Sequence, residues 1–125
     1  MSNAYKILVV EDEHSLAAAL KDKLSKEGFL VIEAKNGEEG LEAVKKESPD
    51  LILLDIVMPK MDGLTMLEKC REELDRDVPV IMLTNLSDKF RVAKSLNEGA
   101  YDYLIKSDWS LEDIVKRIKE KLNIS

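Results

Sequence analysis

The sequence predicts a doubly wound α/β fold, in which a parallel β-sheet is covered by helices on both faces. Two observations carry the prediction. Apolar runs of strand length alternate along the chain with amphipathic stretches of helix length. Within the runs, apolar and polar residues do not alternate, which is typical of strands buried on both sides. Parallel neighbours also need a crossover connection, and the crossover is normally a helix.

The predicted strands are the apolar runs at residues 6–10, 29–34, 51–54, 80–83 and 101–105. Helical spacing is clearest in the last amphipathic stretch, where apolar side chains recur with charged residues between them at Leu111, Ile114, Val115, Ile118 and Leu122. No internal repeat or flexible linker divides the chain. The elements therefore follow one another as strand and helix throughout.

Helix boundaries are marked by residues with known capping preferences. Asn36 with Glu39, and Ser110 with Asp113, resemble capping boxes at helix starts. Asp62 precedes a helix that is expected to begin near Gly63. At the other ends, the residues suited to close a helix are Gly28 and Gly99.

The length and charge of the chain limit the classes of protein it can belong to. Its 125 residues are enough for one domain, predicted over residues 6–122, with a tail at 123–125. Residues 1–5 are expected to be a disordered start, with Ser2–Asn3–Ala4 typical of a cloning scar.

The net charge of −6 argues against direct binding of nucleic acid or anionic membranes. Neither a membrane-spanning run nor a signal peptide is present, so a cytoplasmic location is predicted. The single Cys70 lies in an apolar helical pattern and is interpreted as a core cysteine.

Polar residues follow four of the five predicted strands. The first strand runs into Glu11 and Asp12, the third into Asp55, the fourth into Thr84 and the fifth into Lys106. The carboxyl ends of parallel strands share one edge of the sheet, and ligands bind at that edge. If the second strand lies at the side of the sheet, these residues converge into one pocket with three carboxylates, a hydroxyl and an ammonium group.

Such a pocket suits phosphoryl transfer. Three neighbouring carboxylates repel one another unless a divalent cation lies among them, and Mg²⁺ prefers oxygen ligands while keeping positions for water and phosphate oxygens. Phosphoryl transfer needs a positioned nucleophile together with cationic and hydrogen-bonding groups on the phosphoryl oxygens. A carboxylate can serve as the covalent acceptor. The pattern therefore predicts that Asp55 becomes phosphorylated.

Four segments of the chain resemble the receiver domains of bacterial response regulators, the phosphorylated components of two-component systems. The segments are Val-Val-Glu-Asp-Glu at 9–13, Leu-Leu-Asp-Ile-Val-Met-Pro-Lys-Met-Asp-Gly at 53–63, Met-Leu-Thr at 82–84 and Gly-Ala-Tyr-Asp-Tyr-Leu-Ile-Lys at 99–106. They occur in the family's order and spacing. The resemblance implies a flavodoxin-like five-stranded sheet with the strand order 2-1-3-4-5.

The resemblance also assigns roles to the residues of the pocket. Asp55 would attack the phosphohistidine of a sensor histidine kinase or of a histidine phosphotransfer protein. Asp12, Asp55 and the backbone carbonyl of Val57 would ligate Mg²⁺, for which Mn²⁺ is an alternative, and Glu11 would hold the ion mainly through water. Lys106 would contact the bound phosphoryl group. The domain would act in signalling and not as a conventional enzyme, assisting only its own phosphorylation and dephosphorylation.

A two-state switch is implied as well. Thr84 would hydrogen-bond the phosphoryl group and draw its loop inward, and Tyr103 would change between outward and inward positions. The readout face in relatives is formed by the fourth helix, fifth strand and fifth helix, here residues 88–96, 101–105 and 110–122. This face would contact an output partner or effector domain, and a phosphorylation-dependent homodimer could form through it.

The sequence departs from the family pattern beside the pocket. Ser107 occupies a position where the family usually has a proline, often after a cis peptide bond, so the geometry around Lys106 is left open. Asn85 is larger than the small residue common after the threonine, and it is expected to narrow the access of phosphodonors.

A further departure predicts a long-lived phosphorylated state. Val57 and Leu86 are apolar at positions where many relatives place polar groups that influence the attacking water. Without such groups, hydrolysis of the phosphorylated aspartate is expected to be slow. The loss of phosphoryl label in Mg²⁺ after removal of the donor measures it, and a half-life of seconds would contradict it.

The sequence also bears on three other functions. A phosphorylation-independent binding module with the receiver fold is the main alternative; Ser107 favours it, whereas the complete set of Asp12, Asp55, Thr84 and Lys106 argues against it. A phosphatase of the haloacid dehalogenase kind needs a second acid two residues after the nucleophilic aspartate. In this chain the residue at that position is Val57, which argues against this class. An FMN-binding protein is excluded because acidic residues, and not a phosphate-binding loop, follow the first strand. The sequence does not identify the kinase, the signal or the output.

Overall fold

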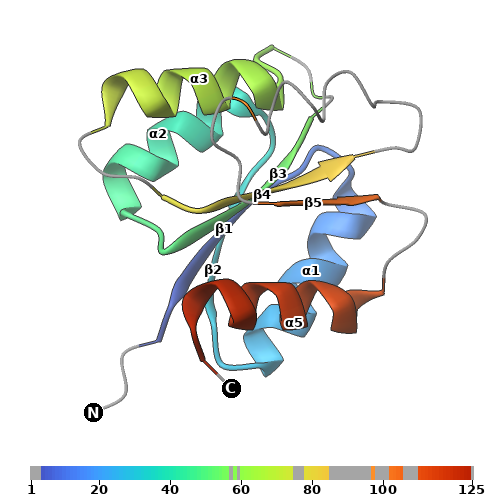
Figure 1. The fold of residues 1–125 in the computed structure, drawn as a ribbon. Helices are drawn as coiled ribbons and strands as arrows, with labels where there is room; N and C mark the ends of the chain where they lie inside the picture. Colours follow the sequence, from blue (N-terminus) through green and yellow to red (C-terminus); the bar gives the residue numbers. More distant parts are fainter. Residues whose placement is uncertain are drawn as a thin grey trace.

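The β-strands of the protein form one parallel sheet in a computed structural model that describes residues 4–56, 58, 60–74, 78–84, 97, 102–105 and 110–124. The strands are β1 (Lys6–Val10), β2 (Leu30–Ala34), β3 (Leu51–Asp55), β4 (Val80–Thr84) and β5 (Asp102–Ile105). The helices of the described ranges are α1 (His14–Lys26), α2 (Gly37–Glu47), α3 (Gly63–Glu73) and α5 (Leu111–Leu122). The strand order is β2-β1-β3-β4-β5, as the resemblance implied (Figure 1).

The register of the strands aligns their carboxyl ends at one edge. Val10, the last residue of β1, pairs with Ala34 of β2 and with Leu54 of β3. Asp55 pairs with Leu83, so Thr84 lies one residue further along the neighbouring strand. The residues that follow β1 and β3 are therefore brought to the same edge of the sheet, as the sequence predicted.

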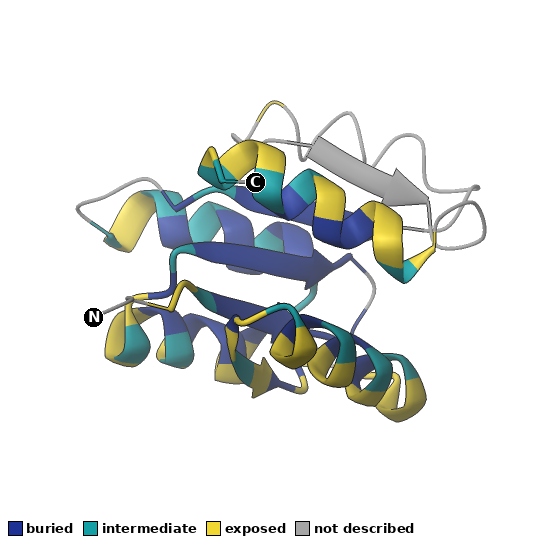
Figure 2. Cartoon of the chain, turned by 90° about the horizontal axis from the view of Figure 1, so that it is seen from below, coloured by how far each residue is buried: buried dark blue, intermediate teal, exposed yellow. Residues whose placement is uncertain are grey.

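Helices cover both faces of the sheet. One apolar cluster includes Leu8 and Leu54 from the strands with Leu67 of α3, and the second includes Val9 and Leu53 with helix residues from α1 and α5. Neighbouring residues of β1 and β3 thus enter opposite clusters, which explains why these runs are apolar without alternation. For β2 the prediction of burial on both sides was wrong, because this strand lies at the side of the sheet and Leu30 is 53% exposed. The buried strands lie between helices whose outer sides are exposed (Figure 2). Among the described residues, no helix is long and apolar enough to cross a membrane.

The helix starts predicted from the sequence are confirmed, with one difference in detail. Asp62 accepts a hydrogen bond from the Thr65 N–H at 2.9 Å, and Ser110 and Asp113 form a reciprocal capping box. Asn36 accepts from the Glu39 N–H at 2.9 Å, but the Glu39 carboxylate accepts from the N–H of Lys35 and not from that of Asn36. The backbone N–H that donates to Glu39 is therefore that of the residue before the N-cap.

One of the two predicted helix ends can be checked in the structure. Gly28 follows α1 with a φ of 95°, the left-handed conformation that closes a helix and that glycine adopts readily. Gly99, which was predicted to close another helix, lies outside the described residues.

Ion pairs on the protein surface join the C-terminal end of α1 to α5. The Lys119 ammonium lies 3.0 Å from the Glu27 carboxylate, and its hydrogen bond holds the pKa of that carboxyl below the ordinary value. Lys23 lies 3.6 Å from Glu27 and also pairs with Glu112 of α5. Because these groups are in contact with water, each pair contributes little to stability, and the apolar cluster beneath carries most of the contact.

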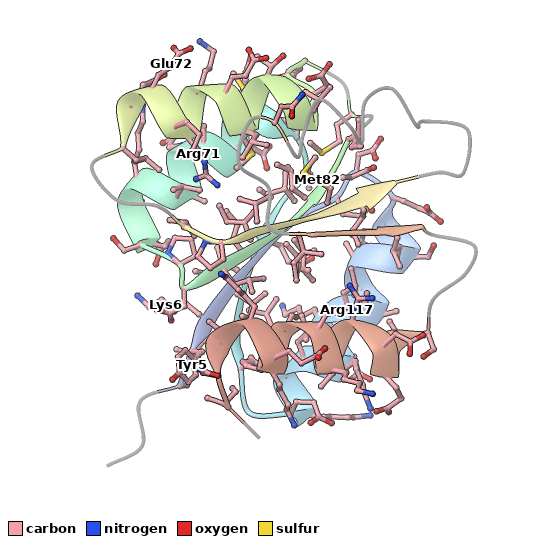
Figure 3. The ribbon with its side chains drawn as sticks, viewed as in Figure 1. Tyr5, Lys6, Arg71, Glu72, Met82 and Arg117 are labelled. Atoms are coloured by element: carbon pink, nitrogen blue, oxygen red, sulfur yellow. The ribbon has the colours of Figure 1, made fainter. Side chains whose placement is uncertain are left out.

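Cys70 is a core residue, as the sequence predicted. It is buried in the cluster between the sheet and the α2–α3 layer, to which Met82 of β4 also belongs (Figure 3). Burial raises the pKa of the Cys70 thiol to about 11 because the charged thiolate is poorly solvated there. At neutral pH the group is a protonated thiol, so it packs as a small apolar side chain.

Candidate functional site

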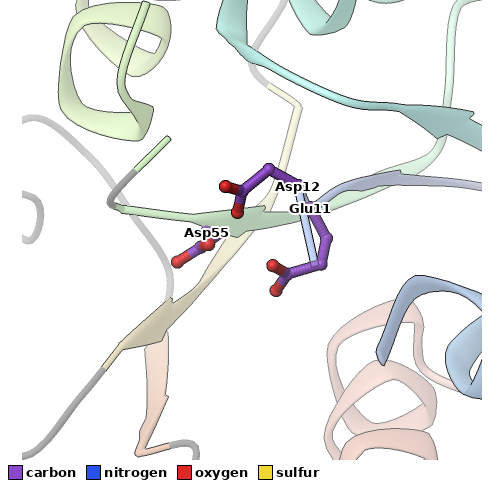
Figure 4. A group of neighbouring side chains, drawn as sticks. All are labelled: Glu11, Asp12 and Asp55. Carbon is purple, nitrogen blue, oxygen red and sulfur yellow. The ribbon is translucent and has the colours of Figure 1, made fainter. Parts of the chain in front are cut away.

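Three carboxylates meet at the carboxyl edge of the sheet. Glu11 and Asp12 directly follow β1, and Asp55 is the last residue of β3. Each contributes a carboxylate oxygen to a group in which all these atoms lie within 4.8 Å of one another (Figure 4). Glu11 and Asp55 are 2% and 4% exposed, whereas Asp12 is exposed. The cluster therefore has two buried members and one side open to solvent.

Glu11 is fixed by hydrogen bonds at the start of α1. Its Oε2 atom accepts from the Glu13 N–H at 3.0 Å, and its own N–H donates to the Ala34 carbonyl at 3.0 Å. The N-terminus of a helix favours a carboxylate because its first N–H groups point outward. The sequence did not reveal this bond, since an acidic residue three positions before a helix has no distinctive spacing.

The composition of the cluster fits a divalent cation with a preference for oxygen. Carboxylates this close repel one another, and the repulsion is greatest where burial excludes water. Mg²⁺ and related hard cations bind to carboxylate oxygens and relieve that repulsion. Oε2 of Glu11 accepts from the Glu13 N–H, and each of the three side chains offers a carboxylate oxygen that could hold such a cation.

The backbone at Asp55 is held by close contact with the start of α3. The Gly63 N–H donates to the Ile56 carbonyl at 2.8 Å. A Cβ atom on Gly63 would lie 2.2 Å from the Asp55 carbonyl oxygen, so only glycine allows this approach. Between them the chain reverses through Lys60, which has a φ of 65°. This bracing was also missed by sequence reasoning, because Asp-Gly at 62–63 indicates a turn but not its partner.

The other predicted site residues can be placed only in part. Thr84 ends β4 and its backbone pairs with Ile105, while the backbone of Tyr103 pairs with Met82. Their side chains lie outside the described part of the structure. So do Val57, Asn85, Leu86, residues 88–96, Lys106 and Ser107. The structure thus brings together Glu11, Asp12 and Asp55, and the roles assigned to these and to the other site residues stay predictions.

The comparison with protein families decides the class of the protein. The model of the response regulator receiver domain matches residues 7–119. The chain belongs to this family. The receiver domain is 44% identical over 117 residues to a probable transcriptional regulator, ycf27, of Porphyridium aerugineum, with 94% of this chain and 48% of that protein covered.

Solved structures agree with this assignment. A CheY-like receiver domain protein from Methanospirillum hungatei has a TM-score of 0.90 and 34% identity, with 97% of this chain and 95% of that chain covered. A chain of the CheX–CheY–BeF3–Mg²⁺ complex from Borrelia burgdorferi has a TM-score of 0.85 and 30% identity, with 94% of this chain and 89% of that chain covered. The receiver domain spans about half the length of the curated ycf27 relative but nearly all of the M. hungatei chain.

Proposed function

We propose that this receiver domain accepts a phosphoryl group on Asp55 from the phosphohistidine of a sensor histidine kinase or a histidine phosphotransfer protein. The observation that carries the proposal is the position of Asp55. Its carboxylate is almost fully buried at the end of a central strand, within 4.8 Å of carboxylate oxygens of Glu11 and Asp12. A structural acid would gain nothing from two further acids so near, whereas an acceptor that shares a cation with them would.

The reaction would be a direct transfer between two side chains. An Asp55 carboxylate oxygen attacks the phosphorus, the bond between the phosphorus and the imidazole nitrogen breaks, and that nitrogen takes up a proton. The product on this chain is an aspartyl phosphate. The close contact of Gly63 with the backbone at Asp55 and Ile56 would restrict where the attacking carboxylate can lie, which would lower the entropic cost of the transfer.

The metal and the other polar groups have separate tasks in this proposal. Asp12, Asp55 and the Val57 carbonyl would hold Mg²⁺, with Glu11 acting through water, and the bound ion would neutralise charge on the phosphoryl oxygens. Lys106 and Thr84 would contact the remaining oxygens. Support comes from the acidic cluster and from the similarity to a chain of the CheX–CheY complex that was solved with BeF3 and Mg²⁺.

The output would follow from movement of Thr84 and Tyr103. We infer that their response changes the face formed by residues 88–96, 101–105 and α5, where an effector domain or output partner would bind. Similarity to a transcriptional regulator about twice as long supports an effector domain, and similarity to a CheY-like chain of equal length supports a separate partner. A cytoplasmic location and a phosphorylation-dependent homodimer stay predictions.

Intact-mass measurement tests the acceptor. The protein is incubated with Mg²⁺ and acetyl phosphate, and wild type is compared with Asp55→Asn and with Asp22→Asn, which alters an exposed acid of α1. We expect one phosphoryl group on wild type and on Asp22→Asn, lost after hydroxylamine treatment, and none on Asp55→Asn. Equal gain on Asp55→Asn would assign the acceptor elsewhere. No gain on wild type, also with histidine kinases as donors, would favour the phosphorylation-independent module.

A further inference from the structure

The start of α2 is hydrogen-bonded to the loop that follows β3, the strand that ends at Asp55. The Gly37 N–H donates to the Met61 carbonyl at 2.9 Å. A Cβ atom on Gly37 would lie 2.3 Å from that oxygen and 2.8 Å from the Met61 Cβ. The φ of Gly37 is not in the left-handed region, so glycine is needed there for the contact alone.

The helix that provides this bond cannot easily withdraw. Asn36 is 5% exposed and caps α2 through the Glu39 N–H. One turn later, a Cβ atom on Gly40 would lie 2.7 Å from the Met66 Sδ and 3.0 Å from the Val10 Cγ2, so α2 already lies against α3 and β1. A side chain at Gly37 would therefore be accommodated by movement of the loop at Met61 and not by movement of α2.

Movement at Met61 would reach Asp55 through a short path of backbone. Met61 lies two residues before Gly63, whose N–H donates to the Ile56 carbonyl and on which an added Cβ would lie 2.2 Å from the Asp55 carbonyl oxygen. The two ends of the loop are therefore joined by the bond between Gly63 and Ile56. Its middle part is joined to α2 by the bond between Gly37 and Met61. A shift of a few tenths of an ångström at Met61 is passed to the end of β3 because interiors packed this closely transmit strain.

We propose that Gly37 is a positioning residue for the phosphoacceptor site: by holding Met61, it sets where the Asp55 carboxylate lies relative to Asp12. The inference rests on the proposed function, in which Asp12 and Asp55 share a Mg²⁺ ion. Gly37 touches neither the ion nor the phosphoryl group. Its effect should appear as weaker metal binding by a protein that is still folded.

Calorimetric titration with Mg²⁺ tests the role, with Gly37→Ala compared against wild type and Gly28→Ala. Gly28 has a φ of 95° and no atom within 4 Å of an added Cβ, so its substitution strains the backbone without touching the site. We expect Gly37→Ala to bind Mg²⁺ about tenfold more weakly, as for loss of a group that orients a ligand. Gly28→Ala should bind like wild type although it is less stable.

A second pair of variants covers the case in which Gly37→Ala does not fold. Asn36→Ala loosens the start of α2 without adding a clash, and Ser110→Ala removes a cap of the same kind from α5. Mg²⁺ binding should weaken severalfold in Asn36→Ala and stay unchanged in Ser110→Ala. If folded Gly37→Ala or Asn36→Ala binds Mg²⁺ as wild type does, the positioning role is wrong. Failure of wild type itself to bind Mg²⁺ would instead overturn the proposed function.

Discussion

Gly63→Ala is expected to slow phosphorylation of Asp55 by about a hundredfold. It should also lower the free energy of unfolding by about 1–3 kcal/mol, the usual cost of overpacking. The added Cβ would lie 2.2 Å from the Asp55 carbonyl oxygen and 3.0 Å from the Ile56 Cα. Both neighbours are backbone atoms of β3 and the residue after it, so no side chain can rotate away to relieve the contact. The acceptor itself must shift.

The size of the effect on transfer follows from the geometry of the reaction. The attacking oxygen must lie close to the phosphorus and in line with the bond that breaks, and a misplacement of about 1 Å costs about a hundredfold in rate. The stability loss is partly offset, because alanine favours the start of α3 over glycine by up to about 1 kcal/mol. Transfer should therefore suffer much more than folding does.

Urea unfolding and intact-mass measurement with acetyl phosphate separate the two effects. Gly28→Ala is the matched control, since a left-handed alanine costs about 1–2 kcal/mol without touching the site. It should be destabilised to a similar extent and still take up the phosphoryl group. A folded Gly63→Ala that is phosphorylated at the wild-type rate would show that the contact with Asp55 does not position the acceptor.

The sequence predicts the sheet well because burial on both faces leaves a direct trace in composition. The run at 51–54 became the fully buried β3 with Asp55 added, whereas the run at 29–34 became β2 from Leu30, which lies at the side of the sheet and is only partly buried. The caps at Asp62 and Ser110 were also recognisable, because capping uses a few side chains at fixed spacing. The order of the strands could not be predicted in this way, because connection lengths alone do not determine which strand lies at the side of the sheet. The correct order came from the resemblance to receiver domains.

The acidic residues of the candidate site could be predicted from the sequence, but the backbone contacts that hold them in place could not. Glu11, Asp12 and Asp55 could be expected to meet because parallel strands end at a common edge. The bonds from Gly37 to Met61 and from Gly63 to Ile56 join backbone groups, which carry no residue-specific signal. A weak indication existed in each case, because glycine is a poor helix former and yet stands first in both α2 and α3. Glycine there is explained by close approach of another segment.

Mg²⁺ is expected to stabilise the wild-type protein by about 2.7 kcal/mol at a concentration one hundred times its dissociation constant, because the ion binds the folded state. Asp12→Ala should lose this increment, since it removes one of the three carboxylates that would hold the ion. Without metal, the same variant should be more stable than wild type, because one charge has been taken from a group of three acids. Urea unfolding with and without Mg²⁺, at matched ionic strength, measures both effects.

The opposite signs of these two effects make the test specific for a shared cation. A variant that merely damaged the fold would lose stability in both conditions, and one that had no role at the site would keep the full increment from Mg²⁺. Asp22→Asn, which removes an exposed charge paired with Lys26, should behave in the second way. If Asp12→Ala keeps the wild-type increment, the ion binds elsewhere on the chain. If its increment is lost without a gain in the metal-free protein, repulsion among the three acids is not what the cation relieves.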